Sequence, residues 1–115
     1  MTVTIDKKQC PTFKTFYEIV YKELDGKRIP DWEAYENLNY HADLFNEFLW
    51  YVNDMNIDFV LLNTDVEKIK EEKTYDDYEW NLIIEILTEF VMKYPNNTLT
   101  IFKGETDNLF FSENS

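Results

Sequence analysis

Carboxylates and aromatic side chains are the residues whose types and spacing suggest chemistry in this sequence. Between Asp31 and Asp58 the chain carries seven acidic residues and neither lysine nor arginine. Within that stretch, HADLFNEFLWYV (residues 41–52) places Asp43 and Glu47 four residues apart. On a helix this spacing brings both carboxylates to one face, where they repel each other slightly. Paired carboxylates can hydrolyse glycosides, bind a hard metal ion or receive the cationic side chains of a partner.

The sequence offers little else for catalysis or metal binding. It contains no glycine-rich phosphate loop, no metal-ligand spacing and no nucleophile–base pair. Hydrolysis and metal binding also need a concave site, whereas these acids lie on a convex helix face. Cys10 and His41 are the one cysteine and the one histidine, so an internal disulfide is impossible and a metal site would lack ligands. We expect a structural thiol at Cys10, a partly buried histidine at His41, no cofactor, no metal and no enzyme activity.

The charge of the chain favours a basic partner. The formal net charge is −12 and the sequence pI is about 4.3, so the surface repels nucleic acid and anionic membranes and attracts basic proteins. Solubility alone is the competing explanation for such acidity. The N-terminus has no apolar run of signal-peptide length, and no segment is long enough to cross a membrane. We therefore expect a cytoplasmic protein that binds neither nucleic acid nor membrane.

The predicted elements belong to the α/β class. Alternation and β-branched residues predict strands at residues 2–5, 58–62 and 98–102, of which the near-continuous apolar run 58–62 suits a strand buried on both faces. Apolar residues at helical spacing predict helices at 12–24, 41–52 and 76–93, with a short helical turn at 32–37. Residues 63–75 are predicted to form a loop with room for one helical turn. We expect one domain at 1–102 and a partly flexible extension at 103–115.

Helical geometry separates the residues of 41–52 into two faces. At about 100° per residue, the apolar face holds Phe45, Phe48, Leu49 and Val52. The outer face holds Asp43, Asn46, Glu47 and Trp50. On the later helix, Glu85 and Glu89 lie opposite the apolar stripe. Both acidic faces can be ordinary solvated surfaces, and Trp50 can cover a neighbouring loop instead of binding a partner.

HADLFNEFLWYV with the strand after it resembles the core motif of the barstar family, the intracellular inhibitors of barnase-like ribonucleases. The family motif is approximately Asn-Leu-Asp-Ala-Leu-Trp-Asp-x-Leu, which falls on residues 41–49 here. Asp43 and Leu49 match the motif, and Glu47 stands at the position of its second aspartate. The resemblance spans about residues 2–102, mostly as an order of elements. The family's Tyr-Tyr-Gly-x-Asn lead-in is replaced by ENLNYH, and Asn46 replaces its tryptophan, with an aromatic returning at Trp50.

This resemblance implies a fold, a partner and a binding site. The fold is a barstar-like three-stranded parallel sheet with a single layer of helices and a short connecting helix. The implied function is to block the cationic active site of a ribonuclease with an acidic helix. The family's chief acidic contact falls on Glu47, with Asp43 beside it, and a glutamate of the family's later helix falls on Glu89, with Glu85 one turn away.

The acidic and aromatic residues of the two helices make up the predicted binding site. The predicted partner-binding residues are Tyr40, Asp43, Asn46, Glu47, Trp50, Tyr51, Glu85 and Glu89. The expected partner of this monomeric protein is a basic ribonuclease or other nuclease toxin. One alternative is an acidic DNA mimic, which would spread carboxylates along a large face. Another is a regulatory adaptor that binds a different basic partner and needs no concentrated acidic patch.

Overall fold

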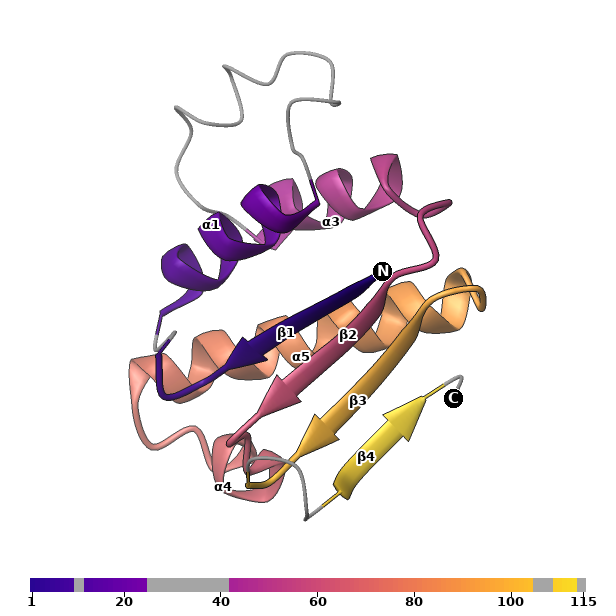
Figure 1. The fold of residues 1–115 in the computed structure, drawn as a ribbon. Coiled ribbons are helices and arrows are strands. Elements are labelled where there is room, and N and C mark those ends of the chain that lie inside the picture. Colours follow the sequence, from indigo (N-terminus) through magenta and orange to yellow (C-terminus); the bar gives the residue numbers. More distant parts are fainter. Residues whose placement is uncertain (10–11, 25–41, 105–108, 114–115) are drawn as a thin grey trace.

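A parallel sheet of three strands organises the fold, as the sequence predicts. The computed structural model describes residues 1–9, 12–24, 42–104 and 109–113, with the backbone alone for residues 13, 42–44 and 109–113. The elements are β1 (Thr2–Asp6), α1 (Phe13–Glu23), α3 (Ala42–Tyr51), β2 (Asp58–Leu62), α4 (Val66–Lys70), α5 (Tyr75–Lys93), β3 (Thr98–Phe102) and β4 (Leu109–Glu113). Strands β1, β2 and β3 are parallel neighbours in that order (Figure 1).

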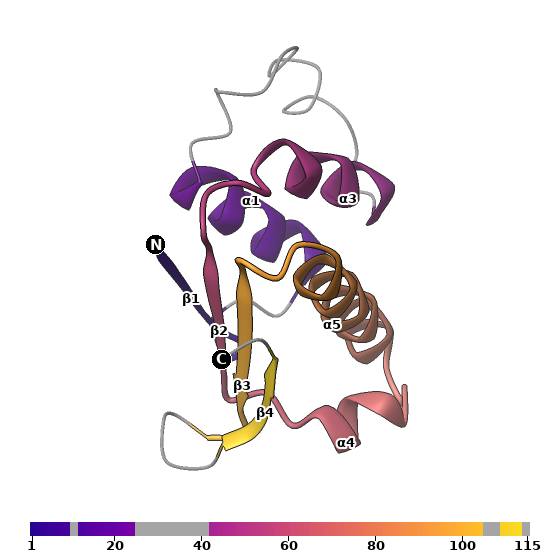
Figure 2. The same ribbon diagram turned by 90° about the vertical axis from the view of Figure 1, so that its right-hand side faces the viewer.

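The described helices pack on one face of this sheet. Figure 2 shows α5 on one side of the strands, with α1 and α3 beside it. Burial alternates along the strands, and the register aligns two rows of buried side chains, Val3–Phe59–Leu99 and Ile5–Leu61–Ile101. The expectation that residues 58–62 are buried on both faces is therefore wrong. Their other face is only half-buried, because a single layer of helices can cover only one side of a sheet.

Side-chain caps fix where the helices begin. At the start of α1, the Thr12 hydroxyl accepts a hydrogen bond from the Thr15 backbone N–H. Thr74 caps α5 in the same way through the N–H of Asp77. Asp65 caps the five-residue helix α4, so the short helical turn allowed within residues 63–75 is present. The predictions for Cys10, for His41 and for the short helical turn at 32–37 lie outside the described residues.

The C-terminal segment contributes a strand that the sequence analysis did not predict. Strand β4 pairs antiparallel with β3, with a register irregularity between Ile101 and Phe102. Its sequence, LFFSE, has no clear alternation. Pairing with β3 satisfies backbone N–H and C=O groups that a free sheet edge would leave open. The sheet therefore has four strands, in the order β1-β2-β3-β4.

A buried asparagine holds together the two turns at the amino edge of the sheet. The Asn97 side chain is 0% exposed, and its Oδ1 accepts the Ile57 N–H at 2.8 Å. Its Nδ2 donates to the backbone oxygens of Asn53 and Tyr94, each at 3.0 Å. The exposed neighbour Asn96 adds a second donation to the Asn53 oxygen. The turn that follows α3 is thereby attached to the turn that follows α5.

A carboxylate is held in the corresponding place at the opposite edge of the sheet. At the end of β1, Asp6 accepts hydrogen bonds from the Asn63 side chain and the Lys8 backbone N–H, each at 2.9 Å. These two bonds, the Asn63 bond first, lower the pKa of Asp6 below its ordinary value of 3.8. Asn63 adopts a positive φ of 53°, a conformation that asparagine tolerates better than most residues. Asp6 thus ties β1 to the turn after β2.

Candidate functional site

Helix α3 presents a polar and aromatic face because its other face is anchored in the core. Its inward side chains Phe45, Phe48 and Leu49 are fully or almost fully buried, as is Val52 directly after the helix. Asn46, Glu47 and Trp50 are exposed. The division between inner and outer faces is the one that the helical spacing predicts. The outer face of α3, meaning Asp43, Asn46, Glu47 and Trp50, is called the α3 face below.

Aromatic contacts fix the orientation of this helix. Phe48 stacks on the ring of Tyr21 with centroids 4.2 Å apart, and Phe45 meets Phe16 edge-on at 5.3 Å. Tyr17 donates its hydroxyl hydrogen to the Tyr21 hydroxyl at 2.8 Å, so the aromatic cluster also satisfies its buried polar groups. Each such ring pair stabilises by about 0.5–1.5 kcal/mol beyond its buried area. Rotation of α3 would break these contacts, which is why the α3 face has a fixed direction.

Two predicted residues of the site are only partly located. The backbone of Asp43 lies in α3, one turn before Glu47, and so on the same side of the helix. Its side chain is outside the described part of the structure. Tyr40 lies wholly outside the described residues.

Within the described residues, no salt bridge is found for Glu47. The pairs Lys73–Glu71 at 3.0 Å and Lys103–Asp65 at 3.8 Å lie outside α3. The last turn of α3 also lacks a basic residue. A carboxylate in this position is solvated by water and remains available to a cationic side chain. Glu47 is therefore a carboxylate on the α3 face that a cationic side chain can reach from solvent.

Trp50 and Tyr51 form an exposed aromatic pair beside Glu47. Trp50 is 56% exposed and Tyr51 is 37% exposed. Their rings meet edge-on, with centroids 5.0 Å apart and planes at 75°. The Asn53 side chain donates to the Trp50 backbone oxygen and closes the C-terminal end of the helix. Since more than half of the indole is exposed, it can bury apolar area against a partner.

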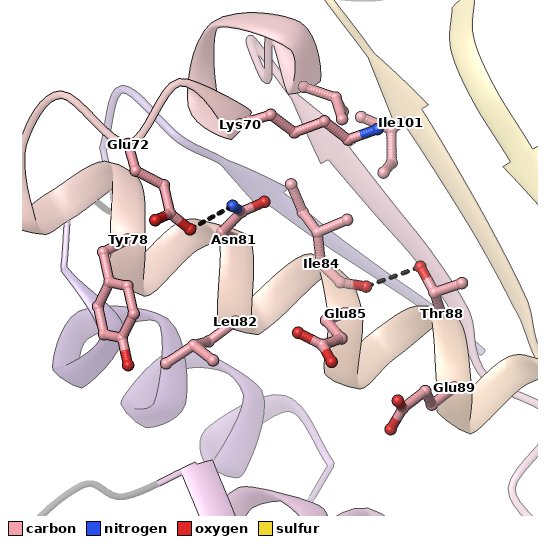
Figure 3. A pocket seen from close by; sticks show the side chains of 11 residues that line it. Lys70, Glu72, Tyr78, Asn81, Leu82, Ile84, Glu85, Thr88, Glu89 and Ile101 are labelled. Carbon is pink, nitrogen blue, oxygen red and sulfur yellow. Dashed lines mark hydrogen bonds between the residues drawn. The ribbon is translucent and has the colours of Figure 1, made fainter.

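The two glutamates of the predicted site that lie on α5 line a groove. Glu85 and Glu89 are exposed on the side of α5 that faces away from the sheet. They line a groove of about 650 Å³ that runs along α5 towards α4 (Figure 3). Helices α3 and α5 contact each other, but within the described residues no hydrogen bond or ion pair links the α3 face to these glutamates. Of the eight predicted residues, five lie on α3 and two on α5, while Tyr40 is outside the described residues.

Sequence reasoning missed the other residues of this groove. Lys70 and Glu72 come from α4 and the turn after it, whereas Asn81 comes from α5. The Asn81 side chain donates to the Glu72 carboxylate at 2.7 Å, and Glu72 has a positive φ of 49°. The available signal was Asp65, a residue type that begins helices, placed directly before Val66-Glu67-Lys68-Ile69-Lys70. Treating residues 63–75 as a charged loop hid the wall of the groove.

The described residues form neither a metal site nor a membrane-spanning helix. Across the described ranges, no three of the histidine, cysteine, aspartate and glutamate side chains are placed to hold a metal ion. No described helix combines the length and the hydropathy needed to cross a membrane.

No family model, curated protein or solved structure matches this chain. Its function must therefore be argued from the α3 face and the groove.

Proposed function

We propose that this protein is a cytoplasmic inhibitor of the immunity or antitoxin type, and that its partner is a basic ribonuclease or a related nuclease toxin. The α3 face enters the cationic active site of that nuclease and excludes RNA. Carboxylates of Glu47 and Asp43 take the places of substrate phosphates. The protein acts by binding alone, and it uses no cofactor.

The observation that carries this proposal is the joint exposure of Glu47 and Trp50 on one face of an anchored helix. An exposed ion pair in water stabilises by only about 0–1 kcal/mol. The same pair contributes more when a partner's cleft excludes water, and an arginine can bond a carboxylate with two parallel N–H groups. Trp50 beside Glu47 supplies the apolar area that excludes water from such a pair.

The fold supports the same proposal. A three-stranded parallel sheet with one layer of helices is the architecture that the barstar resemblance implies, and the sheet of this chain has it. The aromatic contacts between α1 and α3 hold the acidic helix in one orientation before binding. A rigid binding face reduces the entropy that association costs. The formal net charge of the chain, −12, accelerates its encounter with a basic partner at low salt.

Inhibition of purified basic ribonucleases, assayed on a fluorogenic RNA, tests the proposal. The panel includes any basic protein encoded in the neighbouring reading frame. Wild type is compared with the double variant Asp43→Lys, Glu47→Lys and with Glu67→Lys. Glu67 is exposed on α4, so the last variant controls for reversing a charge elsewhere. We expect inhibition to be lost in the double variant and kept in the control, with both variants folded by circular dichroism.

An acidic DNA mimic would behave differently in this assay. Its affinity would fall by similar amounts for charge reversals on α3 and on α4, because a long face shares the contacts. If the loss of affinity per reversed charge were equal in the double variant and in Glu67→Lys, the protein would be a DNA mimic and the proposed inhibitor function would be wrong.

A further inference from the structure

The groove beside α5 has walls from two helices and a floor from the core. Figure 3 shows Asn81, Ile84 and Thr88 on the side of α5 that faces Lys70 and Ile101. Val66, Ile84 and Ile101 are apolar, and Val66 and Ile101 belong to the buried core. Residues of α4, α5 and β3 thus meet around one depression of about 650 Å³. A space of this size can receive one or two apolar side chains of a partner.

Acidic groups dominate the edge of the groove. Glu72, Glu85 and Glu89 line it, against the single cation Lys70 among its described lining residues. Glu85 and Glu89 stand one helical turn apart on the outer side of α5 (Figure 3). Within the described residues, neither of these two glutamates forms a salt bridge. An occupant that carries positive charge would balance this edge.

Two polar side chains of the groove walls form hydrogen bonds within the protein. Asn81 donates to the Glu72 carboxylate, and the Thr88 hydroxyl donates to the Ile84 backbone oxygen at 2.7 Å. These bonds occupy the Thr88 hydroxyl hydrogen and one N–H of Asn81 within the protein. The floor therefore offers apolar contact, and the edge offers unneutralised carboxylates.

We propose that this groove docks a basic, amphipathic peptide segment of a partner protein. An apolar side chain of the segment rests on Val66, Ile84 and Ile101. Its lysines or arginines meet Glu85 and Glu89, and Glu72 receives a third cation at the far end. This surface lies on α4 and α5 and does not use the α3 face, so the inference goes beyond the proposed function and stands without it.

Amide shifts of the ¹⁵N-labelled full-length chain test the inference. The probe is a short lysine–leucine peptide with leucines at helical spacing. An oligolysine and a glutamate–leucine peptide of the same length are the comparisons. We expect the lysine–leucine peptide to shift the amides of Val66, Asn81, Ile84 and Thr88, and we expect neither comparison peptide to do so at equal concentration. Equal shifts with oligolysine would reduce the site to a general acidic field and overturn the proposal.

Two substitutions on α5 provide a matched pair. Thr88→Lys puts a bulky cation into the groove, whereas Met92→Lys adds the same charge at a side chain that is 63% exposed and is not among the described lining residues. We expect Thr88→Lys to weaken peptide binding about tenfold and Met92→Lys to weaken it less than about threefold. Equal effects of the two substitutions would overturn the proposal.

A second variant guards against a local folding defect in Thr88→Lys. Glu85→Lys changes an exposed residue, and we expect about tenfold weaker peptide binding with an unchanged melting temperature. Shifts at the groove amides that depend on protein concentration without peptide would assign the groove to a second copy of this chain and overturn the proposal. Unaltered peptide binding in Glu47→Lys is expected, since that residue belongs to the α3 face.

Discussion

Replacing Asn97 with alanine should destabilise the protein far more than replacing its neighbour Asn96. Asn97 is 0% exposed, and its side chain makes three hydrogen bonds to backbone groups of other residues, at 2.8, 3.0 and 3.0 Å. Asn96 is exposed and donates to the Asn53 oxygen and the Asn56 side chain. The two residues are adjacent and identical in type, so they form a matched pair.

The expected cost of Asn97→Ala can be worked out from these bonds. The Ile57 N–H would be left buried without its acceptor, at a cost of about 1–3 kcal/mol, and two further bonds contribute about 0.5–1.5 kcal/mol each. The sum, about 2–6 kcal/mol, lowers the melting temperature of a chain of this length by roughly 10–25 °C. For Asn96→Ala, water replaces the lost bonds, and the cost is about 1 kcal/mol or less.

Urea unfolding and thermal melts followed by circular dichroism measure both variants. Because Asn97 attaches the turn after α3, its loss should also increase amide exchange in residues 52–56. Equal destabilisation by the two substitutions would refute the reasoning, since it would mean that burial of the Asn97 bonds does not matter.

Three further predictions concern single side chains. The folded-state pKa of Asp6 is lowered by its bonds to Asn63 and Lys8. The ionised carboxylate therefore stabilises the folded state above the unfolded pKa, and this stabilisation disappears as the pH falls through and below 3.8. Urea unfolding should therefore show wild type more stable than Asp6→Asn at pH 7, with the difference vanishing in acid, and a constant difference would contradict this. Phe48→Ala should cost about 3–5 kcal/mol in urea unfolding, because Phe48 is fully buried, and a loss below about 1 kcal/mol would contradict its anchoring role. Trp50→Ala should change stability by no more than about 0.5 kcal/mol while removing the most readily quenched tryptophan fluorescence of the described residues, which acrylamide titration measures.

Local pattern was sufficient to predict strands β1, β2 and β3 and the three longer described helices, α1, α3 and α5. Strands β2 and β3 have the predicted bounds, because each is a short apolar or β-branched run between polar turn residues. The prediction that residues 58–62 are buried on both faces was wrong, because the composition of a strand does not show how many layers of helices cover its sheet. Strand β4 was missed, because it is defined by backbone pairing with β3 and its own sequence has no clear alternation.

The α3 face could be predicted, and the groove could not. Exposure of Glu47 and Trp50 follows from helical periodicity within twelve residues of sequence, so counting along the helix was enough. The groove joins Val66, Asn81 and Ile101, which come together only when α4, α5 and β3 pack. Glu85 and Glu89 line this groove, and their assignment to one binding site with Glu47, made on the resemblance, stays a prediction.

The decisive measurement compares inhibition of a basic ribonuclease by wild type with inhibition by the variant whose α3 face is charge-reversed. The account predicts that wild type inhibits at least one nuclease of the panel, and that Asp43→Lys with Glu47→Lys weakens this inhibition about 100-fold or more, equivalent to ~2.7 kcal/mol. Glu67→Lys should inhibit as wild type does. Absence of inhibition by wild type, or equal inhibition by the double variant, would contradict the account.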